Sequence, residues 1–146
     1  MDKKTILFVE DDKDDLAFSM RAFKDNKAFF NYLIMAYDGI QAKKYLMIDD
    51  EKRQMEIGIK PDLIILDLKL PYVSGLEILE KIKKYEHTKN IPVVVYTSSD
   101  DPKDLIKSYQ MGANSFVKKP ENYEEFINVL KKIINYWLEV NMSPES

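Results

Sequence analysis

The sequence lacks several residue types that common functional sites need. It contains no cysteine, which excludes disulfide bridges and metal sites built from thiolates. It has one histidine, His87, which lies in the polar stretch YEHTKNIP and is typical of a surface residue. Serine–histidine catalysis and histidine-rich metal sites therefore have little support.

Basic residues and long apolar runs are also scarce. Only two arginines occur and the formal net charge is −3, which argues against a nucleic-acid-binding surface, because such a surface needs concentrated positive charge. The chain opens with MDKKT rather than an apolar signal segment, and no apolar run is long enough to span a bilayer. We therefore expect a cytoplasmic protein that contacts neither nucleic acid nor membrane.

The composition that remains is that of a globular protein. Hydrophobic residues make up 45% of the 146 residues and charged residues 32%, in a length that fits one domain with one sizeable core. We find no internal boundary, repeat or low-complexity tract. The sequence predicts a single domain over residues 1–146, with a core over about residues 4–138, a polar tail over residues 139–146 and no separate output domain.

Short apolar runs alternate with segments of helical pattern. The expected strands are Thr5–Val9, Tyr32–Ala36, Leu63–Leu66, Pro92–Thr97 and Ser115–Lys118. The expected helices are Asp14–Lys24, Gly39–Asp50, Gly75–Tyr85, Pro102–Met111 and Tyr123–Leu138. The polar connection over residues 48–62 should combine a helix extension with a surface loop. Five strand–helix repeats predict a doubly wound α/β sandwich around a five-stranded parallel sheet.

Polar and charged residues lie at the carboxyl ends of four of these strands. They are Glu10, Asp11 and Asp12 at the first, Asp67 at the third, Thr97 and Ser98 at the fourth, and Lys118 and Lys119 at the fifth. Because parallel strands end at the same edge of a sheet, these groups should converge there. Carboxylates with a lysine opposite suit a hard cation such as Mg²⁺ and could support phosphoryl transfer to a carboxylate.

Four motifs in this order resemble the receiver domain of two-component response regulators: VEDD, LIILDLKLP, VVVYTSS and VKKP. The resemblance covers roughly Lys4 to Leu138. It implies a flavodoxin-like receiver fold that takes a phosphoryl group from the phosphohistidine of a sensor histidine kinase. A late YWLEV and the long segment before KPDLIILDLKLP resemble the stand-alone regulators that work with phytochrome-type kinases.

The resemblance also implies roles for the acidic residues. Asp67 matches the phosphoacceptor, and Glu10 and Asp11 match the acidic pair that holds Mg²⁺ together with Asp67. The backbone carbonyl of Lys69 would be a further ligand. The partner of Asp11 could instead be Asp12, although the spacing from the apolar run favours Glu10.

The hydroxyl, the lysine and the aromatic residue of the family pattern also have counterparts. Thr97 matches the switch hydroxyl, and Lys119 matches the lysine that meets the phosphate. Lys118 should face away from Lys119 and be solvated. Pro120 suggests a cis peptide after Lys119, as is usual in this family. Phe116 stands at the position of the aromatic switch residue, and could equally be a core aromatic.

Three functions compete for this arrangement. The first is a phosphoacceptor signalling protein that acts through protein–protein contacts and is not a turnover enzyme. The second is an aspartate-nucleophile phosphohydrolase, which commonly carries a second aspartate two residues after the nucleophile, where this chain has Lys69. The third is a pseudo-receiver binding module, which should lack Asp67, the acidic pair or Lys119. The signalling protein fits best.

Two helices offer surfaces for partners. Leu16 and Met20 on the first helix should form an exposed apolar pair where a histidine kinase docks. On the last helix we expect a second apolar strip of Ile127, Ile134 and Leu138 to stay exposed and to support a homodimer. The downstream protein partner is not specified by the sequence.

Overall fold

The computed structural model describes residues 3–48 and 58–144. Its strands are β1 (Thr5–Val9), β2 (Tyr32–Ala36), β3 (Leu63–Leu66), β4 (Val93–Thr97) and β5 (Ser115–Lys118). Its helices are α1 (Lys13–Asp25), α2 (Gly39–Leu46), α3 (Gly75–Lys84), α4 (Pro102–Gln110) and α5 (Tyr123–Asn135). A 3₁₀ turn, η1 (Lys27–Phe29), follows α1, and a π-helical turn, η3 (Tyr136–Val140), continues α5.

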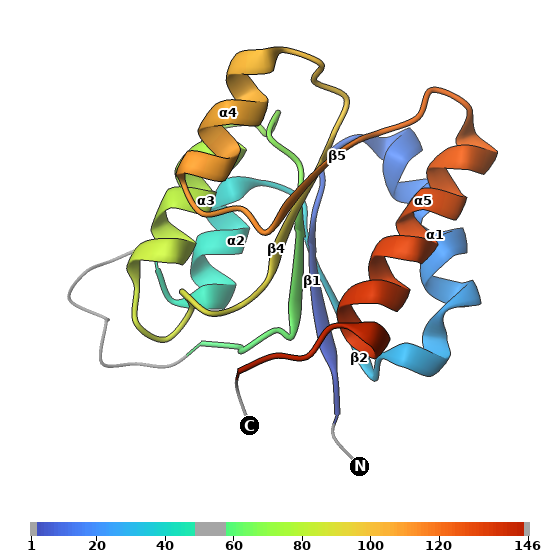
Figure 1. Ribbon diagram of the computed structural model, residues 1–146, viewed down its shortest axis with the longest axis horizontal. Helices are drawn as coiled ribbons and strands as arrows, with labels where there is room; N and C mark the ends of the chain where they lie inside the picture. The colour runs from blue at the N-terminus through green and yellow to red at the C-terminus, as the bar shows by residue number, and fades with distance from the viewer. Residues whose placement is uncertain (1–2, 49–57, 145–146) are drawn as a thin grey trace.

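The strands form one parallel sheet in the order β2-β1-β3-β4-β5. Helices α1 and α5 cover one face of the sheet, and α2, α3 and α4 cover the other (Figure 1). The expected doubly wound α/β fold is thereby confirmed. The strand order reverses at β1, so the carboxyl ends of β1 and β3 lie at the topological switch point, where folds of this kind bind ligands.

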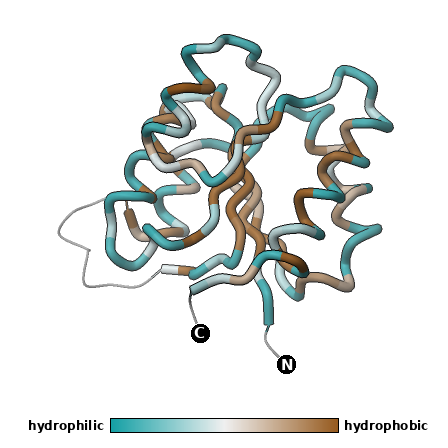
Figure 2. The backbone as a smooth tube through the Cα atoms, viewed as in Figure 1, coloured by the Kyte–Doolittle hydropathy of each residue, from teal (hydrophilic) through white to brown (hydrophobic). Residues whose placement is uncertain are grey.

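Side chains of the sheet alternate between two apolar layers. Along β1, Leu7 and Val9 pack toward α2 and α3, whereas Ile6 and Phe8 pack toward α1 and α5. Every residue of β3 and β4 is buried, because helices cover both of their faces. The apolar stretch through the middle of the molecule is visible in Figure 2.

Side-chain caps explain where the helices begin. The side chains of Asp12, Asp38, Ser74, Asp101 and Asn122 each accept a hydrogen bond from a backbone N–H in the first turn of the following helix. Such caps satisfy donors that have no partner inside the helix. The turns that carry Asp12 and Asp101 are those that follow β1 and β4, so the caps also fix the chain beside the candidate site.

Helix α2 ends earlier than the sequence predicted. Met47 adopts a left-handed conformation with φ of 58°, and its N–H donates to the carbonyl of Lys44. The N–H of Ile48 donates to the carbonyl of Lys43, which closes the helix end. The helix predicted to continue to Asp50 therefore ends at Leu46, and that part of the prediction is wrong. Much of the predicted loop over residues 48–62 lies outside the described residues.

The exposed strip predicted on the last helix is wrong. Ile127, Ile134 and Leu138 are buried, at 8%, 0% and 2% exposure. The physical reason is that α5 packs against α1 as well as against the sheet, so it needs an apolar surface wider than a single stripe (Figure 1). These buried residues are not available to a second copy, so they give no support to a homodimer through this strip.

The exposed pair predicted on α1 is also only half correct. Met20 is 46% exposed, but Leu16 is partly buried against the core between α1, α5 and the sheet. Phe18 packs on the ring of Phe126, as a residue on the inner stripe should. Among the helices of the described ranges, none is both long and apolar enough to cross a membrane.

Candidate functional site

Backbone hydrogen bonds continue the parallel ladder past the strand ends. The N–H of Glu10 donates to Ala36 at 3.0 Å, and the N–H of Asp67 donates to Val9 at 3.1 Å. Between the ends of β4 and β5, the N–H of Lys119 donates to the carbonyl of Thr97 at 2.7 Å. The first residues after β1, β3 and β5 are therefore held at one edge of the sheet, as their positions in the sequence predicted.

Lys119 lies at the centre of a charged cluster at this edge, together with Glu10, Asp15 and Asp67. Its side chain is 6% exposed. The partners of its ammonium nitrogen are Glu10 Oε1 at 2.6 Å, Asp15 Oδ2 at 2.7 Å and Asp67 Oδ2 at 3.0 Å. An ammonium group has three N–H donors, so each can serve one carboxylate. Lys119 thus ties together the ends of β1 and β3 and the first turn of α1.

Asp15 is the one residue of this charged cluster that the sequence analysis missed. It lies in the first turn of α1, where acidic residues commonly complement the helix dipole. The available signal was its spacing: Asp15 stands four residues after Asp11, in the first turn of the helix that follows the first strand. That spacing alone could not distinguish a residue of the site from an ordinary solvated acid.

Three carboxylates form a group that could hold a metal ion. One oxygen from each of Glu10, Asp11 and Asp67 lies within 4.8 Å of the others. Asp12 is not in this group, since its side chain caps α1 by accepting from Asp15 N at 2.9 Å. Glu10 is buried, and its Oε2 accepts from the backbone N–H groups of Asp11 and Asp12 at 3.1 Å each. The structure thus places Glu10, rather than Asp12, beside Asp11 and Asp67.

The charges of this cluster perturb one another. Burial, reinforced by repulsion from Asp67, raises the pKa of Glu10, and Lys119 opposes that rise. Burial also raises the pKa of Asp11. For Lys119, burial alone would lower the pKa, but the carboxylates of Asp67 and Glu10 outweigh it and raise the pKa above its usual value. The acids outnumber the lysine, so the site has an excess of negative charge that a divalent cation would relieve.

The hydroxyl predicted as the switch is buried beside the β4–α4 connection. Thr97 has no exposed surface, and its Oγ1 accepts from Ser99 N at 3.3 Å. Ser99 in turn donates to Asp104 in α4 at 2.5 Å. Thr97 is therefore linked to the start of α4 through Ser99.

The residues around Lys119 give one correction. Lys118 is exposed and pairs with Asp100 at 3.4 Å, as its predicted outward position requires. Phe116 is partly buried against the core beside α3. The peptide between Lys119 and Pro120 is trans, so the predicted cis bond is wrong. Proline lowers the preference for trans without abolishing it, so the sequence alone does not decide the isomer.

The loop after Asp67 packs closely on the strand it leaves. Gly75 N donates to the carbonyl of Leu68 at 2.9 Å, and a Cβ atom at Gly75 would lie 2.2 Å from the carbonyl oxygen of Asp67. Only glycine allows this approach. The N–H of Lys69 lies 3.4 Å from Asp67 Oδ1, and the side chain of Lys69 is exposed. The loop thus holds the backbone of Asp67 while leaving its carboxylate oxygens at the edge of the sheet.

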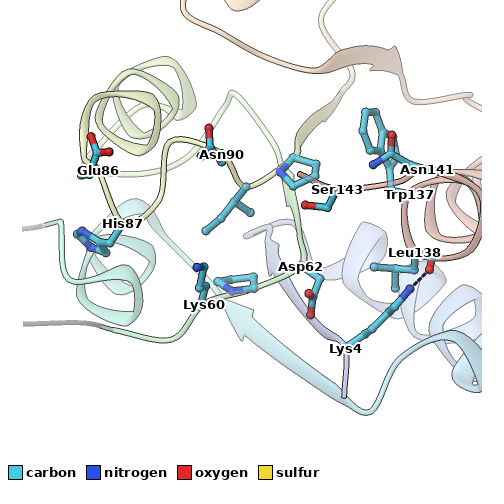
Figure 3. A pocket seen from close by; sticks show the side chains of 13 residues that line it. Lys4, Lys60, Asp62, Glu86, His87, Asn90, Trp137, Leu138, Asn141 and Ser143 are labelled. Atoms are coloured by element: carbon cyan, nitrogen blue, oxygen red, sulfur yellow. Dashed lines mark hydrogen bonds between the residues drawn. The ribbon is translucent and has the colours of Figure 1, made fainter. Parts of the chain in front are cut away.

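A hollow of about 300 Å³ lies at the opposite, amino end of the sheet (Figure 3). Two of its charged side chains connect segments that are distant in the sequence. Asp62 accepts from Thr5 N at 2.8 Å, and Lys4 donates to the carbonyl of Leu138. The ring of His87 lies at the far side, with Nε2 2.9 Å from the carbonyl of Leu46. We assign this hollow to the packing of the chain rather than to the candidate site.

Comparison with known proteins gives a consistent family. Residues 6–131 match the family model described as the response regulator receiver domain. Response regulator Rcp1 of Synechocystis sp. is 35% identical over 141 residues, which cover 97% of this chain and 93% of Rcp1. The probable methanogenesis regulatory protein FilR2 of Methanothrix harundinacea is 36% identical, over 95% of this chain and 86% of that protein.

Solved structures agree with these relatives. The Mn²⁺-bound form of response regulator Rcp1 superposes with a TM-score of 0.84 at 34% identity, over 97% of this chain and 99% of that chain. The phosphorylated cyanobacterial phytochrome response regulator RcpA gives a TM-score of 0.86 at 32% identity, over 99% and 100% of the two chains. The bacteriophytochrome response regulator AtBRR gives 0.70 at 35% identity, over 98% and 97%.

Proposed function

Because this chain belongs to the family of response regulator receiver domains, we propose that it accepts a phosphoryl group on Asp67 from the phosphohistidine of a sensor histidine kinase. The names of two similar structures, a phytochrome response regulator and a bacteriophytochrome response regulator, support a kinase of phytochrome type. The observation that carries the proposal is the lysine of the fifth strand end, Lys119, bound to both Glu10 and Asp67.

The proposed step is a displacement at phosphorus. A carboxylate oxygen of Asp67 forms a new O–P bond while the N–P bond of the phosphohistidine breaks, and the bonding electrons stay on the departing imidazole, which takes up a proton. With acetyl phosphate the bond that breaks is the O–P bond, and acetate leaves. The product in both cases is an acyl phosphate on Asp67.

We propose Mg²⁺ as the cation of the acidic group. Its ligands would be Glu10, Asp11 and Asp67, whose oxygens already lie close together, with the backbone carbonyl of Lys69 as a further oxygen donor. All are hard oxygen ligands, which suits Mg²⁺ better than a soft metal. When bound, the ion would neutralise part of the charge on the transferring group.

The remaining roles fall to Lys119 and Thr97. Lys119 would donate to a phosphoryl oxygen, for which its ammonium group is already buried beside Asp67. Thr97 would donate its hydroxyl to another phosphoryl oxygen, and a movement of its side chain toward that oxygen would lengthen the bond that its Oγ1 now accepts from Ser99 N. Because Ser99 binds Asp104, such a movement would reach the start of α4.

Two alternatives are less well supported. A phosphohydrolase would need a general acid near the acyl phosphate, yet the position two residues after Asp67 carries Lys69 with an exposed side chain. A pseudo-receiver would lack part of the charged site, whereas the acceptor, the acidic pair and the lysine all occur together here. We therefore propose a signalling protein with self-catalysed phosphorylation and dephosphorylation only.

Acetyl phosphate with Mg²⁺ provides the test. We expect mass spectrometry to find one phosphoryl group per wild-type chain and none on Asp67→Asn. Asp62→Asn is a matched control, because it removes a carboxylate from the opposite end of the sheet, and it should be labelled like wild type. Labelling of Asp67→Asn at wild-type stoichiometry would show that another residue is the acceptor.

Partner surfaces need revision from the sequence-based prediction. On α1, Met20 remains available to a kinase, whereas Leu16 is partly buried. A homodimer, or a downstream partner, could use the exposed apolar side chains that one helix, α4, presents together: Leu105, Ile106 and Tyr109 are 41%, 55% and 49% exposed. Sedimentation of Ile106→Glu beside wild type, with and without acetyl phosphate, tests whether α4 supports self-association.

A further inference from the structure

All three N–H donors of the Lys119 ammonium group are already in use. Its three N–H groups face three carboxylate oxygens, at 2.6, 2.7 and 3.0 Å. A phosphoryl group on Asp67 brings new oxygens that need the same lysine. A phosphoryl oxygen can reach Lys119 in two ways: it takes over the donor that now serves Asp67, or another partner, Glu10 or Asp15, releases the lysine.

The three partners differ in how firmly the rest of the protein holds them. The Glu10 side chain is 1% exposed, and its second oxygen already accepts from two backbone N–H groups. Asp67 is buried and is the acceptor itself. Asp15 is 25% exposed at its side chain and lies outside the acidic group that could hold a metal. Water can replace Lys119 at Asp15 at little cost, whereas a buried carboxylate would lose its partner without compensation.

The backbone of Asp15 is fixed even though its side chain reaches solvent. Its N–H donates to the cap residue Asp12 at 2.9 Å, and its carbonyl accepts from Ser19 Oγ at 2.6 Å. The carboxylate is therefore presented to Lys119 from the rigid first turn of α1. Asp14, the preceding residue, is exposed and is not a partner of Lys119.

From this geometry we infer that Asp15 is a positioning residue that competes with the phosphoryl group for Lys119. It holds the ammonium group while Asp67 is unmodified, and it is the carboxylate that Lys119 releases when Asp67 carries a phosphoryl group. The inference rests on the proposed function of Asp67. Its consequence is that Asp15 disfavours the phosphorylated form, because Lys119 must leave it first.

Beryllofluoride is a suitable probe, because it adds to a carboxylate as a stable, tetrahedral mimic of a phosphoryl group and is measured at equilibrium. At saturating Mg²⁺, calorimetry should show that Asp15→Asn binds beryllofluoride about fivefold more tightly than wild type, a size typical of one partly exposed ion pair. Asp14→Asn removes the same charge from the same helical turn and should stay within about twofold of wild type. Asp15→Glu should restore affinity toward the wild-type value.

The outcomes separate this inference from the proposed function. If Asp15→Asn binds beryllofluoride equally or more weakly than Asp14→Asn, Asp15 does not compete and the inference is overturned. If wild type shows no Mg²⁺-dependent binding, or if binding survives in Asp67→Asn, the assignment of the acceptor fails instead.

A measurement on the wild-type protein covers the case in which Asp15→Asn does not fold. Carbon-13 NMR of the aspartate carboxyl groups should show the Asp15 signal shifting on addition of beryllofluoride, because its ammonium partner leaves. The Asp14 signal should not shift. An unmoved Asp15 signal, beside shifts at Asp67, would mean that Lys119 keeps Asp15 in the phosphorylated form, which contradicts the inference.

Discussion

Two lysines with several hydrogen-bond partners lie at opposite ends of the sheet and differ in their neighbours. Lys119, at the carboxyl end, faces three carboxylates. Lys83 lies near the amino ends of β4 and β5, and among the residues that the structure describes its ammonium group donates to neutral oxygens only. These are the carbonyl of Ile91 at 2.7 Å, Asn114 Oδ1 at 2.9 Å and the carbonyl of Lys89 at 3.3 Å.

The two surroundings have opposite effects on the charge of the lysine. Burial lowers the pKa of Lys83 to about 8, because its partners carry dipoles rather than charges. Burial also acts on Lys119, but Asp67 and Glu10 outweigh it and raise the pKa. At the amino end the charge of Lys83 is therefore met by neutral dipoles. At the carboxyl end the carboxylates outnumber Lys119, which leaves negative charge that a divalent cation can neutralise.

The largest expected effect comes from removing the lysine at the carboxyl end. Lys119→Met leaves buried carboxylates without their cation, and we expect it to lower the free energy of unfolding by about 3 kcal/mol at neutral pH without Mg²⁺. Mg²⁺ should restore part of this loss, because it can bind the same oxygens. Urea unfolding with and without Mg²⁺ measures both effects.

Lys83→Met is the matched control for that experiment. It also removes a lysine with several partners, but those partners are neutral and the acidic group stays intact. Mg²⁺ should therefore stabilise Lys83→Met only as much as it stabilises wild type, and less than it stabilises Lys119→Met. If Mg²⁺ stabilised both variants equally, the contrast between the two ends of the sheet would be wrong.

A second experiment sharpens the contrast within the acidic end itself. Asp11→Ala should weaken Mg²⁺ binding about tenfold or more, because it removes one carboxylate of the group. Asp12→Ala should leave Mg²⁺ affinity within about twofold, but should lower the free energy of unfolding by about 1 kcal/mol through loss of the cap on α1. Calorimetric titration and thermal unfolding separate the two; the reverse pattern would place Asp12, not Asp11, at the metal.

The smallest expected effect is a pH dependence at Lys83. Its pKa of about 8 lies below the usual 10.5, so between these pH values the unfolded chain binds a proton that the folded protein does not. Stability from this group should therefore rise with pH across that window and be lost as pH falls through 8. Because Lys83 is partly exposed, we expect on the order of 1 kcal/mol.

Only a difference between two proteins isolates that contribution, since other groups titrate in the same range. The free energy of unfolding of wild type minus that of Lys83→Met should increase from pH 8 to 10.5. A flat or falling difference would show that the neutral oxygens around Lys83 retain its proton better than its burial suggests.

The sequence by itself determined the strands, the order of the motifs and the edge where they meet. An apolar run such as Leu63–Leu66 can be recognised as a strand from the sequence alone, because a strand covered on both faces is apolar throughout. Asp67 directly follows β3 and Lys119 directly follows β5, and both strands pair in parallel with β4, so the pairing brings the two residues to the same edge of the sheet. The spacing from the apolar run favoured Glu10 over Asp12 as the partner of Asp11, and Glu10 does lie beside Asp11 in the structure.

Only the tertiary structure decided how each helix is covered and which charges meet. Helical periodicity gives the width of an apolar surface but not the number of neighbours, so it could not show that α5 contacts α1 as well as the sheet, or that Ile127 and Ile134 are buried. Asp15 reaches Lys119 from 104 positions away in the chain, a contact that depends on how α1 packs beside the sheet. Long-range packing, which local patterns do not encode, therefore completed the site.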